Sequence, residues 1–241
     1  MLPAPASGGR IYTGRRRVRL GDSSPGGRLR LDAAARYLQD VSNDDTDDAE
    51  LGDDAWVVRR TVVDVPAFPV LGEALALTTF CTGTGARWAE RRVRIDGVRG
   101  GAIDAVSLWV HIDLASGRPT PLTARFHELY GPAAGGRTVR ARLTHGDPPA
   151  GVDQRQWSLR FTDFDVMGHM NNAAYWAVVE EELARRRDLR CPLRAEMEFR
   201  AAVEQGDEVH LVDDDAEGHL WLWLRRADGT VCASAHVWRT A

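Results

Sequence analysis

Residues 163–176, DFDVMGHMNNAAYW, place two carboxylates, a glycine, a histidine and two asparagines within one predicted strand-to-helix turn. Gly168 gives the backbone freedom where the chain must reverse, and the helix that follows presents free N–H groups. Such a turn can bind a carbonyl oxygen and activate a water molecule. The structural alternative is that Asp165 and Asn171 only cap the turn and the helix, while His169 packs as a neutral side chain.

The helix after this turn is apolar around nearly its whole circumference, which predicts that other elements envelop it. Its apolar residues are Met170, Ala173, Ala174, Tyr175, Trp176, Ala177, Val178 and Val179. Polar side chains at the mouth of an enveloped helix are expected to lie in a low dielectric, where they polarise a bound group strongly.

The chain reads as two units that repeat the order strand, helix, sheet. The first, residues 10–130, has a predicted strand at Val18–Leu20, a helix capped by Asp32, a solvated acidic loop over 43–54, and four strands. A segment rich in Gly, Pro and Arg, 131–152, is the expected linker. The second unit, 153–241, has a strand at 157–161, one helix and four more strands.

The two units match each other at an offset of 141 residues, which indicates an internal duplication. Residues 18–22, VRLGD, correspond to residues 159–163, LRFTD. Under this offset Ser24 stands where Asp165 does, and Arg28 stands where His169 does. The first unit therefore lacks the polar set, and we expect it to contribute no catalytic group.

Composition excludes several classes of protein. The 241 residues are 44% hydrophobic and 27% charged with a net charge of -4, which is typical of a globular protein and disfavours nucleic-acid binding. The longest uncharged stretch, 166–179, is too short to cross a membrane. The N-terminus offers no apolar signal core, so a cytoplasmic location is expected. Three cysteines without C-x-x-C spacing indicate neither a disulfide framework nor a zinc site, and no metal or cofactor is expected.

The sequence resembles the acyl-acyl carrier protein (acyl-ACP) thioesterase family. The similarity runs from about Val18 to the C-terminus and includes WVVRRTVVDVPAFPVLGE, DFDVMGHMNNAAYW and EFRAAVEQGDEV. The resemblance implies an α+β fold with two tandem hotdog domains, each a long helix wrapped by an antiparallel sheet. Because the first unit is a copy without the polar set, we also expect it to form the acyl-chain pocket, with Leu38 and Val57 as candidate lining residues.

The family's catalytic Asp falls on Asp165 and its catalytic His on His169. Plant members carry an Asn at the position of Met167, so the resemblance leaves the role of that amide either vacant or passed to Asn171 or Asn172. A further acid of the family falls near Glu204. The remaining candidates, for substrate binding, are Gly168, Met170 and Trp176.

The function implied is hydrolysis of acyl-ACP or acyl-CoA to free fatty acid, in fatty acid biosynthesis. Two alternatives remain open: a catalytically silent acyl-binding hotdog module, and a hotdog hydratase or dehydratase. The expected partner is the carrier protein or coenzyme A thioester, and a homodimer is compatible with it. Five arginines after the active-site helix either steer this acidic donor or complement the helix end: Arg185, Arg186, Arg187, Arg190 and Arg194.

Overall fold

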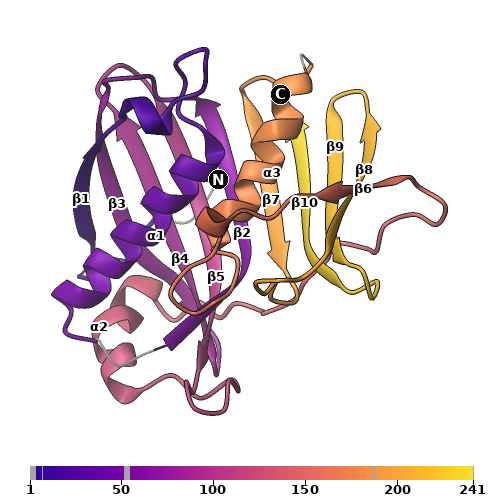
Figure 1. Cartoon of the computed structure of the whole chain (residues 1–241). Helices are drawn as coiled ribbons and strands as arrows, with labels where there is room; N and C mark the ends of the chain where they lie inside the picture. The colour runs from indigo at the N-terminus through magenta and orange to yellow at the C-terminus, as the bar shows by residue number, and fades with distance from the viewer. Residues whose placement is uncertain (1–3, 7, 52–54, 187, 241) are drawn as a thin grey trace.

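The computed structural model describes residues 4–6, 8–51, 55–186 and 188–240 (Figure 1). The elements in chain order are β1 (Tyr12–Arg17), η1 (Leu20–Asp22), α1 (Leu31–Asp48), β2 (Ala55–Ala67), β3 (Ala74–Thr84), β4 (Trp88–Gly97), β5 (Ala102–Ile112), α2 (Ala124–Ala134), β6 (Gln154–Trp157), η2 (Phe161–Asp163), α3 (Asn172–Arg185), β7 (Leu193–Phe199), β8 (Val209–Ala216), β9 (His219–Arg226) and β10 (Val231–Arg239). The described elements thus give each half one long helix and a set of strands, as the sequence predicts.

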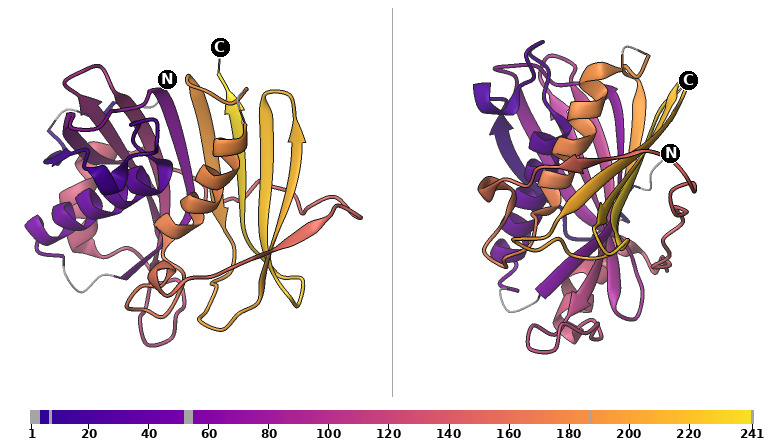
Figure 2. Two further views of the ribbon diagram at one scale, coloured as in Figure 1. Left: turned by 45° about the horizontal axis from the view of Figure 1, so that its top comes forward. Right: turned by 45° about the vertical axis from the view of Figure 1, so that its right-hand side comes forward.

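All the described strands form one antiparallel sheet in the order β1-β3-β4-β5-β2-β7-β10-β9-β8-β6. The halves join where β2 pairs with β7, from Arg60 opposite Glu198 to Val65 opposite Leu193. Helices α1 and α3 lie side by side on the same face of this sheet (Figures 1 and 2). The sheet is therefore continuous across the boundary between the halves, and the two helices meet at that boundary.

The helix α1 buries one face and extends further than the sequence predicts. Leu31, Ala34, Leu38 and Val41 recur at helical spacing and are buried against the sheet. The acidic run, expected as a loop, is helical up to residue 48, and residues 52–54 of it lie outside the described part of the chain. The hydrophobic pattern does not predict these last turns of the helix, because the residue that they bury is the acidic Asp45.

Asp45 is buried because two cations neutralise it. Its side chain is 1% exposed and forms ion pairs with Arg10 and Arg91, the first at 2.7 Å. A buried charge is tolerated when it is paired and hydrogen-bonded. Two smaller predictions in this half are also wrong, since the N-cap of α1 is Arg30 rather than Asp32, and the first strand is β1 rather than 18–20.

The predicted linker 131–152 begins inside a helix. α2 runs from Ala124 through Ala134. Its N-cap is Thr123, whose hydroxyl accepts from the amide of Phe126 at 3.1 Å, and its C-cap is Gly135 with φ +57°. Within the predicted linker, residues 131–134 are helical and residues 135–152 belong to no helix or strand. In the second half β6 ends at Trp157, so most of the predicted strand 157–161 is turn. None of the described helices is long and apolar enough to cross a membrane.

Candidate active site at the turn before α3

The turn before α3 is built around Asp163, which is 2% exposed. Its carboxylate accepts hydrogen bonds from the backbone amide of Arg160 at 2.8 Å and from the Arg160 guanidinium at 2.7 Å. Its carbonyl accepts from the amide of Asn171 at 2.8 Å. Asp163 therefore holds the two ends of the turn together and has no free oxygen for chemistry.

Asp165 is half-buried and its carboxylate is fixed in place by two donors. Oδ1 accepts from the amide of Met167 at 3.0 Å, and Oδ2 accepts from Nδ2 of Asn171 at 3.2 Å. Oδ1 of Asn171 in turn accepts from the amide of Ala173 and caps α3. Asn171 thus caps the helix, as the structural alternative predicts, and also orients the carboxylate of Asp165.

Gly168 adopts φ +75°, the left-handed region that favours glycine, and its amide donates to the carbonyl of Asp165 at 3.0 Å. That amide is therefore occupied. His169 and Glu204 face each other in an isolated antiparallel bridge, and both residues are exposed. The low dielectric expected around the histidine is absent, because the turn projects into solvent; Met167 is itself 60% exposed.

The helix α3 is buried over most of its surface but is not enveloped all round as predicted, because Ala174 and Ala177 are half-buried and line an open groove. Met170 is 4% exposed and Trp176 is 2% exposed, and both belong to the main core. Both side chains pack inside the protein, away from the open side of the turn. The amide side chain of Asn172 forms no hydrogen bond with any described residue, whereas Asn171 does.

The first half repeats the backbone hydrogen bonds of this turn, whereas the side-chain bonds to Asp165 have no counterpart among its described residues. In the second half the amide of Asp165 donates to the carbonyl of His169 at 3.0 Å, and in the first half the amide of Ser24 donates to that of Arg28 at 2.8 Å. α1 begins at residue 31 and α3 at residue 172, again 141 apart. The structure therefore confirms that Arg28 occupies the place of His169.

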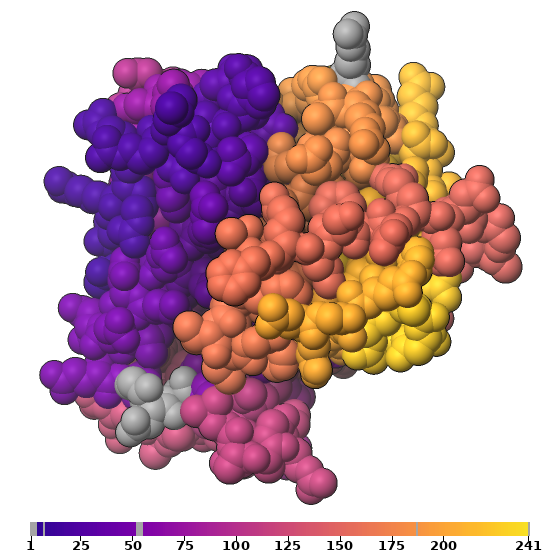
Figure 3. Space-filling model, viewed as in Figure 1, coloured from indigo at the N-terminus to yellow at the C-terminus, as the bar shows by residue number. Residues whose placement is uncertain are grey.

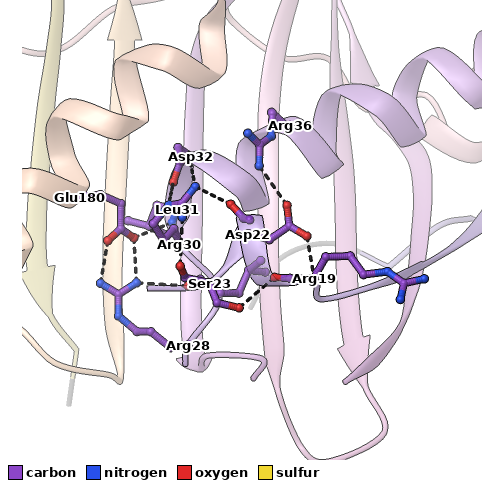
Figure 4. Close-up of polar contacts among 11 residues, drawn as sticks. Arg19, Asp22, Ser23, Arg28, Arg30, Leu31, Asp32, Arg36 and Glu180 are labelled. Carbon is purple, nitrogen blue, oxygen red and sulfur yellow. Dashed lines mark hydrogen bonds and ion pairs between the residues drawn. The ribbon is translucent and has the colours of Figure 1, made fainter. Parts of the chain in front are cut away.

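Arg28 closes the first-half site by reaching across to the second half. Its guanidinium forms two hydrogen bonds of 2.8 Å with the carboxylate of Glu180 in α3 (Figure 4). Oε1 of Glu180 also accepts from the amide of Leu31, the first residue of α1, at 2.6 Å. Of the three consecutive glutamates 180–182, Glu180 thus lies at the interface between the halves, and only Glu181 is exposed.

An open groove runs between α1 and α3 and reaches Asp165. Its walls come from both halves, with Arg36, Gln39 and Asp40 on α1 opposite Asp165 and Asn171. In the space-filling view the turn before α3 lies against the first half (Figure 3). The groove at Asp165 is therefore lined by residues of both halves of the chain.

A separate cavity lies within the first half, between α1, the sheet and α2. Its volume is about 60 Å³, and its lining includes Leu51, Trp56, Cys81, Ala89, Trp109 and Phe126. Of the two residues expected to line an acyl pocket, Leu38 packs in the main core and Val57 is 40% exposed. Neither lines this cavity.

One cluster has the composition of a metal site. The candidate ligand atoms of His145, Glu196 and Glu198 lie within 4.8 Å of one another. Arg60 lies 3.6 Å from Glu196, and Arg200 lies 3.9 Å from Glu198. Burial also lowers the pKa of His145. The arginines already supply the positive charge that a metal ion would bring, so we interpret the cluster as an ion-pair network.

Most of the arginines at and after the end of α3 already have acidic or carbonyl partners within the protein. Arg185, Arg186 and Arg194 each form an ion pair with a carboxylate, and Arg190 donates to main-chain carbonyls. Arg187 lies outside the described residues. This pairing favours a structural role for the four described arginines over a free basic patch.

Comparison with protein families decides which family the chain represents. The model of the acyl-ACP thioesterase N-terminal domain matches residues 9–130, and that of the acyl-ACP thioesterase C-terminal domain matches residues 148–238. The chain belongs to the acyl-ACP thioesterase family. Membership makes the protein an enzyme that hydrolyses the thioester of acyl-ACP, and it confirms the resemblance drawn from the sequence.

Known relatives of this acyl-ACP thioesterase agree. An uncharacterised protein of Mycobacterium tuberculosis, from strains CDC 1551 and H37Rv, is 30% identical over 205 residues, 84% of this chain and 82% of the relative. An acyl-ACP thioesterase of Bacteroides thetaiotaomicron has a similar structure, with a TM-score of 0.80, 18% identity and coverage of 95% of this chain and 97% of that one. The structure of the 12:0-ACP thioesterase of Umbellularia californica is also similar, with a TM-score of 0.78, 18% identity and coverage of 94% of this chain and 96% of that one. These structures confirm the tandem hotdog fold.

Proposed function

We propose that hydrolysis takes place at the turn that carries Asp165 and His169, and that its products are the free fatty acid and the carrier thiol. The observation that carries the proposal is the carboxylate of Asp165, held by Met167 N and Asn171 Nδ2 at the edge of the groove between the halves. A carboxylate oriented by two donors is positioned to act on a water molecule or a carbonyl carbon.

The chemistry needs one activated oxygen and one polarised carbonyl. Asp165 serves as general base or as direct nucleophile. When it acts as the base, water loses a proton to Asp165 while its oxygen bonds to the thioester carbon, and the carbon–sulfur bond then breaks. His169, which is exposed on the same turn, transfers a proton to the leaving sulfur. Glu204, opposite His169 in the backbone bridge, helps to orient it.

Asn171 takes over the function that the family assigns to the amide at the position of Met167. Its Nδ2 already donates to Asp165, whereas the side chain of Met167 points to solvent and only its backbone contributes. The orientation of the carboxylate is thus preserved by a residue of the helix cap.

We further propose that the first half receives the acyl chain and contributes no acid–base group at the place of His169. The guanidinium of Arg28, at that place, is already paired with the carboxylate of Glu180. The cavity beside Trp109 and Ala89 is the apolar space that this half offers, and an acyl chain would have to widen its 60 Å³. We also propose that the enzyme works in cytoplasmic fatty acid biosynthesis, with acyl-CoA as a second donor.

One assay separates thioester hydrolysis from the hydratase and silent-module alternatives. Purified protein is incubated with acyl-ACP and with acyl-CoA while free thiol is measured, and in parallel with enoyl-CoA while the loss of the conjugated double bond is followed by absorbance. We expect thiol release and no change in absorbance. Absorbance change without thiol release would replace the proposal with hydration, and neither signal would leave an acyl-binding module.

A further inference from the structure

The wall of the groove opposite Asp165 carries an amide side chain that the proposed chemistry does not use. Gln39 lies on α1, in the half without the catalytic turn, and is half-buried. It lines the groove together with Asp165 and Asn171. Within the described residues its side chain has no hydrogen-bond partner, so its amide is available to a ligand.

The internal repeat indicates what Gln39 faces. With α1 and α3 starting 141 residues apart, Gln39 is the counterpart of Glu180. Glu180 crosses the boundary and contacts the amide of Leu31 and the guanidinium of Arg28 (Figure 4). By the same repeat we expect the side chain of Gln39 to face the start of α3, and Gln39 does share the groove with Asn171 and Ala173.

The two crossings differ in charge, and this difference matters for a substrate. In the first half the carboxylate of Glu180 fills the positive N-terminus of α1. In the second half a neutral amide stands at the same place, and the backbone amide of Asn172 donates to none of the described residues. An oxygen that develops negative charge can therefore bind where the first half already holds the oxygen of Glu180.

We propose that Gln39 is a substrate-binding residue of the second-half site, whose Nε2 donates to the thioester carbonyl oxygen beside the amide of Asn172. The first half then supplies one polar group to the reaction after all, from its helix rather than from its turn. The proposal rests on the function proposed above, because it assigns the oxygen-binding group to the same hydrolytic site.

The test compares two substitutions of similar size. Gln39→Met keeps the length and packing of the side chain and removes the donor, and we expect kcat on acyl-ACP to fall about 10²-fold, the scale for one oxyanion donor. Gln39→Glu places a carboxylate at the start of α3, as Glu180 does at the start of α1, and we expect a larger loss of kcat. Gln154→Met and Gln154→Glu, at an exposed position of β6, are the matched controls and should keep wild-type activity.

Thermal unfolding of each variant separates a local effect from misfolding, and Asp165→Asn is measured in the same assay. Gln39→Met with wild-type kcat beside an inactive Asp165→Asn would overturn this inference and leave the proposed function standing. A Gln39→Glu variant more active than Gln39→Met would overturn it as well, since the added carboxylate would then be harmless. A wild-type protein that releases no thiol would overturn both proposals.

Discussion

Glu180 of α3 binds Arg28, and Arg28 occupies in the first half the position of His169 in the second. The same place in the repeat is thus an ion pair between the halves in one copy and an exposed histidine in the other. Of the two turns, only the one in the second half carries a carboxylate and a histidine at these places, and it is the turn that we propose to react.

This ion pair is expected to stabilise the contact between the halves. Glu180→Ala leaves Arg28 and the amide of Leu31 without their acceptor, and we expect the free energy of unfolding to fall by about 3 kcal/mol, the low end for a broken buried pair because Arg28 is partly exposed. Urea unfolding measures the change. Glu181→Ala, at the adjacent exposed position, is the control. Equal stability of the two variants would contradict the assignment.

The buried Asp45 provides a second stability prediction. Asp45→Ala removes the acceptor of Arg91 and Arg10, and a cation left buried without its partner costs about 3–5 kcal/mol. Asp47→Ala changes an exposed residue of the same helix and should change the unfolding free energy little. If both variants unfold at the same urea concentration, the charge of Asp45 has no structural role.

Stability is expected to fall in acid because of a stacked histidine. His236 stacks on Trp221, with ring centroids 3.9 Å apart, and on Trp238. Burial, with smaller contributions from His219 and His145, lowers the pKa of His236 to about 4. The unfolded chain has the ordinary value of about 6.5 and binds the proton first. The stability contributed by neutral His236 is therefore complete above about pH 6.5 and is lost as the pH falls toward 4.

A variant that keeps the stack but cannot titrate tests this. His236→Phe should show a smaller drop in melting temperature between pH 7 and pH 5 than the wild type. An identical pH dependence in the two proteins would show that the acid sensitivity comes from other groups.

The cavity in the first half predicts a change in chain-length preference. Ala89→Phe places a ring in space lined by Trp109 and Phe126, and we expect kcat/KM for the longest accepted acyl chains to fall about tenfold relative to short chains. Val57→Phe, at an exposed position, should leave the preference unchanged. A uniform loss for all chain lengths in Ala89→Phe would argue against an acyl pocket there.

Much of the fold can be predicted because local patterns carry it. The period-2 runs predict β2 to β5, and the offset of 141 locates both turns. The last turns of α1 could not be predicted, because Asp45 is buried only through Arg10 and Arg91, which are distant in sequence. α2 was hidden by the Gly and Pro residues in its last turn, which are typical of a linker.

The candidate site also has a part that the sequence predicts and a part that it does not. The motif locates Asp165 and His169, since the turn and the helix cap are local. The pairing of Glu180 with Arg28 and the position of Gln39 depend on how α1 and α3 pack, which no single-sequence pattern specifies. The offset of 141 was the available signal, because it makes Gln39 the counterpart of a residue that crosses the boundary.

The central claim is that Asp165 and His169 hydrolyse acyl-ACP, and thiol release by Asp165→Asn tests it most directly. Asn keeps the size of the side chain and removes its charge, so the fold should be retained while kcat/KM falls at least about 10²-fold. His169→Ala should lose activity on the same scale. We expect wild type to release thiol and folded Asp165→Asn to do so only at this reduced rate. Full activity in folded Asp165→Asn would contradict it.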